Sequence, residues 1–263
     1  MRTNNKLGNL SKLGKLKILL PGIPSRSSRG WFGYCTVILF PLANRWALFD
    51  TGHYSDRALL LESLKFHQIE PDEIGSVVLS HLHFDHMLNM TLFKNAKLIV
   101  SKAELDYAQR VTDGDIDDPS IPDFWPALFK GKDVRQVDDA LELETGIELV
   151  NLSGHTPGCL AMFYHDVVTV AACGDVIKNG WEALTAEAGS PGGAVDMLRK
   201  NSKFIADRAD VIIPGHDRPF IIRDNGIEYL TDVAWQVQGN FFPRPQNEVL
   251  LNLKMKGGYC PKT

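Results

Sequence analysis

The chain has 263 residues, of which 44% are hydrophobic and 23% are charged, an ordinary composition for a globular protein. This composition excludes a long disordered chain, and four cysteines are too few for a disulfide scaffold. No apolar run approaches the ~20 residues that a membrane span requires. We therefore expect a cytoplasmic protein without a membrane partner; the net charge of −4 indicates no particular partner.

Short apolar runs alternate with turns and helical patterns along the chain. Runs of β-branched and aliphatic residues predict strands, and the spacing of leucines between positions 59 and 64 predicts an amphipathic helix. Near position 101, Ser101 is expected to cap a further helix, with Glu104 completing a capping box. The expected strands are 17–20, 35–42, 46–49, 77–79, 96–100, 147–152, 160–164, 167–173 and 211–213, and the expected helices include 56–66 and 194–207.

Three segments differ from this pattern. Residues 1–49 contain 8 of the 28 basic residues and no acidic residue, leaving 20 basic and 32 acidic residues for the remainder. Such a basic N-terminal arm either binds nucleic acid or a membrane, or lies across an acidic body or a neighbouring subunit.

The acidic segment 111–132 also contains aromatic residues, and we interpret it as a lid or pocket wall. The alternative is an insertion that simply packs against the domain. A tail over about 240–263 has little helical period.

The chemistry of the chain is concentrated in the sequence His81-Leu82-His83-Phe84-Asp85-His86, directly after an expected buried strand. On an extended backbone alternate side chains point the same way, so His81 and His83 can converge on one ion. Asp85 and His86 then turn toward a second ion. Imidazole and carboxylate groups are ligands for zinc and related divalent metals. A purely structural role is a poor explanation, because buried groups of this kind need partners.

Three further candidate ligands each follow an apolar strand. His155 lies in a turn between Gly154 and Gly158, and Asp175 and His216 each follow a run of aliphatic residues and a glycine. Each residue is a weak signal alone, but their order after the histidine-rich motif makes the set strong. Loops at strand ends are where α/β scaffolds place functional sites.

Together these motifs resemble the metallo-β-lactamase superfamily. The match covers about residues 15–220 and includes Asp50 in the sequence Phe49-Asp50-Thr51-Gly52. The resemblance implies an α/β protein with an αβ/βα four-layer sandwich, in which two mixed β-sheets are flanked by helices. We expect a single domain of this fold over residues 1–263.

The resemblance also implies the role of each candidate ligand. His81, His83 and His155 would hold one metal ion, and Asp85, His86 and His216 would hold the other. Asp175 would bridge the two ions, and Asp50 would orient the site without binding metal. The expected cofactors are two divalent ions, zinc first, with iron or manganese as alternatives.

A site of this type implies a hydrolase in which a hydroxide bridging the two metals attacks the substrate, with Asp85 as the catalytic residue that orients it. The commonest true β-lactamases carry cysteine at the position of Asp175. Glyoxalase II thioesterases carry a long helical domain after the last histidine, whereas only 47 residues follow His216. The ligand spacing and Phe84 look most like the N-acyl-homoserine lactonases.

We therefore expect a metal-dependent hydrolase of a small lactone or carboxylic ester. The alternatives are a phosphodiesterase of the ribonuclease type, a thioesterase of the glyoxalase II type and a metal-binding sensor without turnover. The basic arm would suit a nucleic-acid partner, but the acidic segment 111–132 would repel phosphates. A small-molecule substrate is thus favoured, and the two tails are compatible with a homodimer.

The substrate pocket is harder to predict. The lactonases carry a tyrosine shortly after the bridging aspartate that contacts the substrate carbonyl, whereas this chain has Lys178 and Asn179 there. Either residue is a candidate for that role. The further pocket candidates are Tyr34, His53, Phe124, Trp125 and Trp181. For the aromatic residues among them, the alternative is that the side chain packs in the hydrophobic core.

Overall fold

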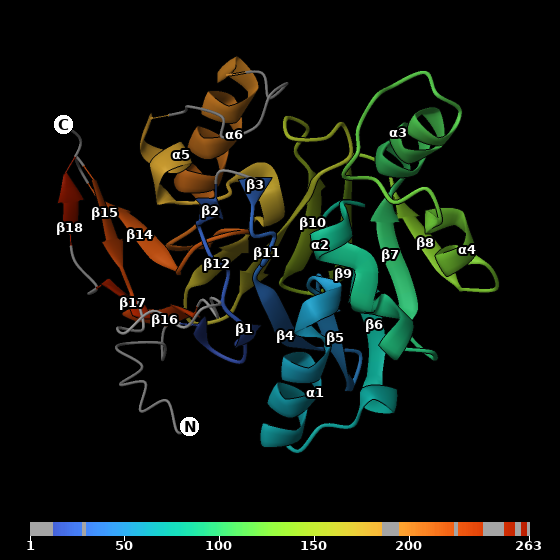
Figure 1. Cartoon of the computed structure of the whole chain (residues 1–263), viewed down its shortest axis with the longest axis horizontal. Helices are drawn as coiled ribbons and strands as arrows, with labels where there is room; N and C mark the ends of the chain where they lie inside the picture. Colours follow the sequence, from blue (N-terminus) through green and yellow to red (C-terminus); the bar gives the residue numbers. More distant parts are fainter. Residues whose placement is uncertain are drawn as a thin grey trace, which may run out of the picture.

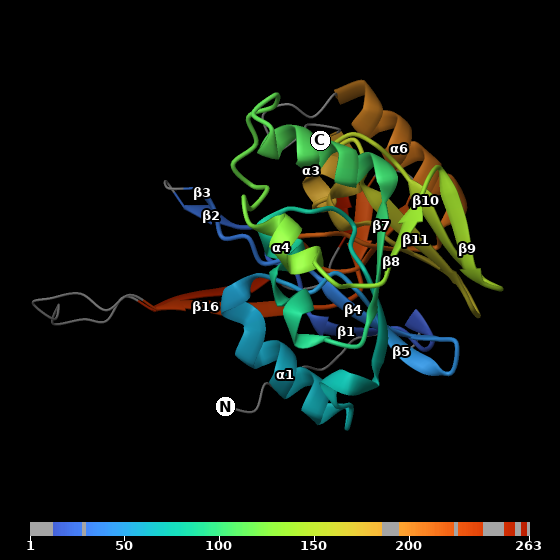
Figure 2. The ribbon, with the colours of Figure 1, turned by 90° about the vertical axis from the view of Figure 1, so that its right-hand side faces the viewer.

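Two β-sheets pack face to face, and helices cover the outer side of each sheet (Figures 1 and 2). The structure is a computed structural model that describes residues 13–27, 30–185, 195–223, 226–238, 250–255 and 259–261. The helix–sheet–sheet–helix order of layers confirms the αβ/βα sandwich that the sequence motifs implied. Residues 1–12 and 28–29 of the basic N-terminal arm and much of the expected tail over 240–263 lie outside the described residues.

The first sheet has six strands in the order β1-β4-β5-β6-β7-β8. β5 to β8 run parallel, so their carboxyl ends meet at one edge of the sheet. Phe49 is paired with Val78, which places the loops after β5 and β6 side by side. The strands are β1 (Lys17–Leu20), β4 (Val37–Leu42), β5 (Arg45–Phe49), β6 (Ile74–Val78), β7 (Lys97–Ser101) and β8 (Val134–Val137).

The second sheet has eight strands in the order β18-β15-β14-β13-β12-β11-β10-β9. β12 and β13 are parallel and also end at one edge, with Ala172 opposite Ile213. The strands are β9 (Ala140–Glu144), β10 (Ile147–Asn151), β11 (Leu160–His165), β12 (Thr169–Ala172), β13 (Val211–Ile213), β14 (Phe220–Arg223), β15 (Gly226–Tyr229) and β18 (Tyr259–Pro261).

Helices α1, α3 and α4 pack on the first sheet, whereas α5 and α6 lie beside the second (Figure 1). Ser101 accepts a hydrogen bond from the backbone N–H of Glu104 (3.0 Å) and so caps α3, as expected. The helices are α1 (Arg57–Phe66), α2 (Phe84–Met87), α3 (Lys102–Thr112), α4 (Trp125–Phe129), α5 (Gly180–Thr185) and α6 (Val195–Arg208). Short 3-10 segments span Tyr54–Asp56, Pro71–Glu73, Leu88–Leu92 and Gly174–Val176.

The core consists of three apolar layers, because successive side chains of a strand point to opposite faces. In β4, Val37 and Leu39 pack toward the helices of the first sheet, whereas Ile38 and Phe40 pack between the two sheets. A third layer lies between the second sheet and α6, and it contains Ile205. The fully apolar β4 is therefore explained by burial on both faces.

Two regions differ from the sequence-based expectations. The acidic segment 111–132, for which no helix was predicted, contains the end of α3 at Thr112 and all of α4, which begins at Trp125. Both helices are held by apolar contacts with the first core layer. Within the expected C-terminal tail, β17 (Leu250–Met255) and β18 are strands, and β18 pairs with β15 at the edge of the second sheet.

Two short hairpins complete the described structure. The hairpin of β2 (Arg26–Ser27) and β3 (Gly30–Trp31) projects from one side of the sandwich in Figure 2. The hairpin of β16 (Val233–Gln238) and β17 extends away from the two sheets in Figure 2. Among the described helices, none combines the length and the apolar character needed to cross a bilayer.

Candidate metal centre

The candidate metal ligands lie at one edge of the sandwich, where strands of both sheets end. The motif after β6 leads into α2 and so remains close to the end of β5. The other ligands come from the second sheet, in the β10–β11 connection and after the parallel strands β12 and β13. The structure thus brings together His81, His83, Asp85, His86, His155, Asp175 and His216.

Three histidines form the first group of potential ligands. The ligand atoms of His81, His83 and His155 all lie within 4.8 Å of one another. His83 Nδ1 lies 3.0 Å from His155 Nε2, so one histidine of each sheet faces the other. His81 Nε2 is buried and has no hydrogen-bond partner. This geometry suits a cation held by three imidazoles.

The second group combines a carboxylate with two histidines. His86 Nε2 lies 3.3 Å from His216 Nε2, and Asp85 Oδ2 lies 3.4 Å from the same atom of His216. His216 Nδ1 faces the backbone oxygen of Tyr34 at 3.1 Å, which leaves Nε2 directed toward the group.

Asp175 lies between the two groups. Its Oδ1 is 3.3 Å from His86 Nε2 and 3.2 Å from His216 Nε2, whereas its Oδ2 is 3.3 Å from His155 Nε2. One carboxylate oxygen therefore faces each group. Gly174, at φ 48°, allows this approach, because a Cβ there would lie 2.5 Å from Ser80 Cβ.

The donor set fits two divalent cations. His81 Nε2 is a buried side-chain atom without a hydrogen-bond partner, an arrangement that is costly in an apolar interior. Asp175 Oδ1 makes no hydrogen bond but lies within 3.3 Å of a nitrogen of His86 and of His216. Nitrogen and oxygen atoms with free lone pairs that converge from two sheets are the ligands that zinc, iron and manganese accept.

Burial and charge set the protonation of these groups. Burial holds the pKa of His81 and of His155 well below the usual value, which favours the neutral, metal-binding imidazole. Burial alone would raise the pKa of Asp175, but nearby His216 and His86 outweigh it and hold that pKa well below the usual range. Asp175 is therefore an anion, the form that can bridge two cations.

Two residues outside the ligand set orient His86. Asp50 Oδ2 lies 2.7 Å from His86 Nδ1, which directs His86 Nε2 toward the ligands. The backbone N–H and the hydroxyl of Ser80 donate to the two oxygens of Asp50, each at 2.7 Å. Asp50 itself has a φ of 60°, a conformation that is uncommon for a residue other than glycine.

A second carboxylate outside the ligand set holds His83. Asp118 Oδ2 lies 3.0 Å from His83 Nε2 and accepts a hydrogen bond from the Tyr107 hydroxyl at 2.7 Å. Burial opposes ionisation of Asp118, but the hydrogen bond from His83 outweighs it and holds the pKa of Asp118 below its usual range. The connection between α3 and α4 is thereby attached to the ligand motif, and Phe84 N–H also donates to Ser120 O at 2.9 Å.

A pocket of about 430 Å³ opens onto the ligands. Apolar side chains from the N-terminal region and from the ligand motif form part of its wall, and the α3–α4 connection contributes another part. The acidic segment thus forms part of the pocket wall. Pro119 and Ser120 line the pocket, whereas the aromatic residues of the segment do not. The lining residues are Ile23, Gly30, Trp31, Gly33, His83, Phe84, Asp85, Pro119, Ser120, His155, Asp175, Lys178, Asn179 and His216.

The predicted pocket residues divide into two sets. Lys178 and Asn179 line the pocket, and Lys178 Nζ lies 3.6 Å from Asp175 Oδ2. The His53 ring packs against the pocket residue Phe84 at 5.6 Å between centroids and against Tyr34 at 6.0 Å, and neither His53 nor Tyr34 lines the pocket itself.

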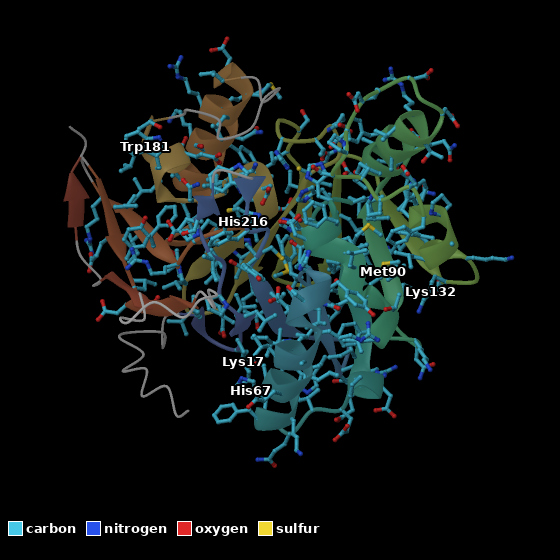
Figure 3. All side chains as sticks on the ribbon, in the orientation of Figure 1. Lys17, His67, Met90, Lys132, Trp181 and His216 are labelled. Carbon is cyan, nitrogen blue, oxygen red and sulfur yellow. The ribbon has the colours of Figure 1, made fainter. Side chains whose placement is uncertain are left out.

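Three aromatic residues lie away from the pocket. Trp125 packs in the first core layer, where its Nε1–H donates to Thr112 Oγ1 at 3.0 Å. Phe124 is 56% exposed and borders a separate hollow of the acidic connection. Trp181 is 62% exposed and lies on α5, set apart from His216 in Figure 3. The pocket role predicted for these three is therefore corrected: one fills the core and two face outward.

Sequence reasoning missed several residues of the site. Trp31 and Ile23 belong to the basic N-terminal region, where only charge was considered. Asp118 is one of several aspartates in an acidic segment, and no local signal distinguishes it. Glu104 was assigned to a capping box, but its carboxylate instead binds the ligand loops.

Comparison with known proteins identifies the family. Residues 29–216 match the model of the Metallo-beta-lactamase superfamily. A metallo-beta-lactamase domain-containing protein 1 of Xenopus laevis is 27% identical over 203 residues, covering 74% of each chain. An N-acyl homoserine lactonase of a Bacillus species is 28% identical over 155 residues, covering 56% of this chain and 58% of that protein. The fold also matches the dizinc quorum-quenching lactonase AidC (TM-score 0.59, 20% identity, 74% of this chain and 78% of that one).

An αβ/βα sandwich with a histidine- and aspartate-rich site at the strand ends defines a metallo-hydrolase. Because the family model spans most of the chain, this protein belongs to the metallo-beta-lactamase superfamily.

Proposed function

We propose that this protein is a dinuclear metal-dependent hydrolase that cleaves a small lactone or carboxylic ester. The observation that carries the proposal is the position of Asp175, with one carboxylate oxygen facing each group of ligands at the floor of a pocket. Zinc is the expected metal, with iron or manganese as alternatives. The similarity to N-acyl homoserine lactonases supports an ester-like substrate.

The size and lining of the pocket support a small substrate. A volume of about 430 Å³ is within the range of small-molecule sites. Trp31 and Phe84 offer apolar surface for an acyl or ring group, whereas Lys178 and Asn179 offer polar contacts near the ligands.

The reaction follows from what the residues can hold and move. Two divalent ions, when bound, would lower the pKa of water and polarise the ester carbonyl. Asp85 lines the pocket beside His216, where its carboxylate can orient the attacking water and pass a proton to the leaving alcohol. Lys178 Nζ lies in the same pocket, 3.6 Å from Asp175 Oδ2, where its positive charge can stabilise an oxygen anion that develops on the substrate carbonyl.

A substrate panel tests the proposal directly. We expect the purified protein to contain about two equivalents of divalent metal and to hydrolyse homoserine lactones or p-nitrophenyl esters faster than bis-p-nitrophenyl phosphate or a glutathione thioester. Faster hydrolysis of the phosphodiester would contradict the ester proposal and support a phosphodiesterase. Faster hydrolysis of the thioester would contradict it and support a thioesterase. One metal equivalent or none would contradict the dinuclear site.

The matched control for this panel is Asp85→Asn. The amide has the size of the carboxylate but cannot accept a proton, so turnover should be lost while the thermal unfolding temperature stays close to that of the parent protein. Retained turnover in this variant would remove Asp85 from the proposed role.

A further inference from the structure

A buried carboxylate lies between the two loops that carry the three-histidine group. Glu104, in the first turn of α3, is completely buried. Its Oε1 accepts a hydrogen bond from the backbone N–H of Leu82 at 2.9 Å. Leu82 separates the two ligands His81 and His83, so this bond holds the ligand loop of the first sheet.

The other oxygen of Glu104 holds the second ligand loop. Oε2 accepts hydrogen bonds from the Thr156 hydroxyl at 2.6 Å and from the backbone N–H of Gly158 at 3.2 Å. Thr156 directly follows His155, the ligand that the second sheet contributes to the three-histidine group. One side chain thus connects ligand loops that belong to different sheets.

The packing around Glu104 leaves little freedom for this connection. A Cβ on Gly158 would lie 2.2 Å from the backbone nitrogen of Glu104 and 2.3 Å from Ser101 Oγ. The His155 loop therefore rests directly on the start of α3. Three donors on two oxygens also leave the carboxylate with well-satisfied hydrogen bonds, as a buried charge requires.

From this geometry we infer that Glu104 is a positioning residue for the three-histidine site, which sets the distance between His155 and the pair His81 and His83. The inference rests on the metal-binding part of the proposed function but not on its substrate. Residues that orient metal ligands typically change metal affinity 10–100-fold when they are substituted. Loss of Glu104 should therefore weaken one of the two sites selectively.

The decisive variant is Glu104→Gln, studied by Zn²⁺ titration of the metal-free full-length chain against a chelating indicator. An amide has one acceptor oxygen, so in either orientation its NH₂ group faces a backbone N–H, that of Leu82 or that of Gly158. We expect about a 10–100-fold weaker Zn²⁺ affinity at one site. His155→Ala and His216→Ala serve as references that remove the first and the second site, respectively.

Two further variants separate positioning from stability. Ser101→Ala removes the cap of the same helix but keeps the carboxylate, so it should lower stability without changing either Zn²⁺ affinity. Thr156→Val removes one donor to Glu104 and should weaken the same site as Glu104→Gln, whereas Thr156→Ser should restore the affinity of the parent protein. These variants test the inference even where Glu104→Gln does not fold.

The outcomes distinguish this inference from the proposed function. If the parent chain binds no Zn²⁺, the metal-dependent function itself fails. If the parent chain binds two ions and Glu104→Gln or Thr156→Val binds them equally well, the positioning role is overturned. An equal loss at both sites, or the same loss in Ser101→Ala, would also overturn it.

Discussion

Lys178 is the side chain to which the proposed function assigns a positive charge beside the substrate. It is buried at the wall of the pocket, 3.6 Å from the carboxylate that lies between the two ligand groups. The homoserine lactonases that the motifs resemble carry a tyrosine close to this position. An ammonium group donates hydrogen bonds as a phenol does, but it adds a positive charge. In the proposed ester hydrolysis, such a charge would stabilise the oxygen anion that develops on the substrate carbonyl.

Replacing Lys178 by methionine tests this role. Methionine keeps most of the apolar volume but removes the charge, and the loss of one donor to a developing oxyanion typically lowers kcat 10²–10³-fold. We expect a fall of that order in kcat for the preferred ester. The control is Lys203→Met on α6, where the lysine pairs with Asp207 at the surface. An unchanged kcat in Lys178→Met would show that Lys178 does not contact the reacting group.

At the scale of elements, α3 and the β10–β11 connection are in close contact beside the site. Gly158 lies so close to the start of α3 that no side chain fits. We expect Gly158→Ala to lower the free energy of unfolding by about 1–3 kcal/mol, because the backbone must shift to admit a Cβ. Urea unfolding of the metal-free protein measures the change.

Gly154→Ala is the matched control in the same loop. A Cβ at Gly154 would meet its nearest neighbour, Asn201 Nδ2, at 3.4 Å, which is an ordinary contact. We expect a change within about 0.5 kcal/mol for this variant. Equal stability of the two variants would contradict the close packing described here.

For the whole molecule, the layer between the two sheets holds the halves of the site together. The first sheet supplies the histidine-rich motif and the second supplies the other ligands, so the apolar side chains between them maintain the site. Phe40 lies in this layer and is completely buried. Truncation of a core phenylalanine leaves a cavity in addition to the lost burial of its ring.

We expect Phe40→Ala to lower the free energy of unfolding by about 3–5 kcal/mol. Phe66→Ala provides the control, because Phe66 on α1 is 80% exposed and its loss should cost about 0.5 kcal/mol or less. Chemical denaturation followed by circular dichroism measures both. A similar loss in the two variants would contradict the three-layer arrangement of the core.

Much of the fold and most of the candidate site could be predicted from the sequence. The ligand candidates His81, His83 and His86 stand within a few positions of one another, and local spacing is a property of the sequence itself. Strands such as β13 could be predicted because a short aliphatic run bounded by turn residues has few alternatives. Local patterns of this kind depend on neighbouring residues only.

Only the tertiary structure decided which residues lie next to the histidine-rich ligand motif. Glu104 and Asp118 contact the ligand loops because α3 and its following connection pack across the end of the first sheet. Trp125 and Trp181 look equivalent in the sequence, yet one fills the core and the other is exposed. Contacts between residues distant in sequence depend on how elements pack, and no short-range pattern records that packing.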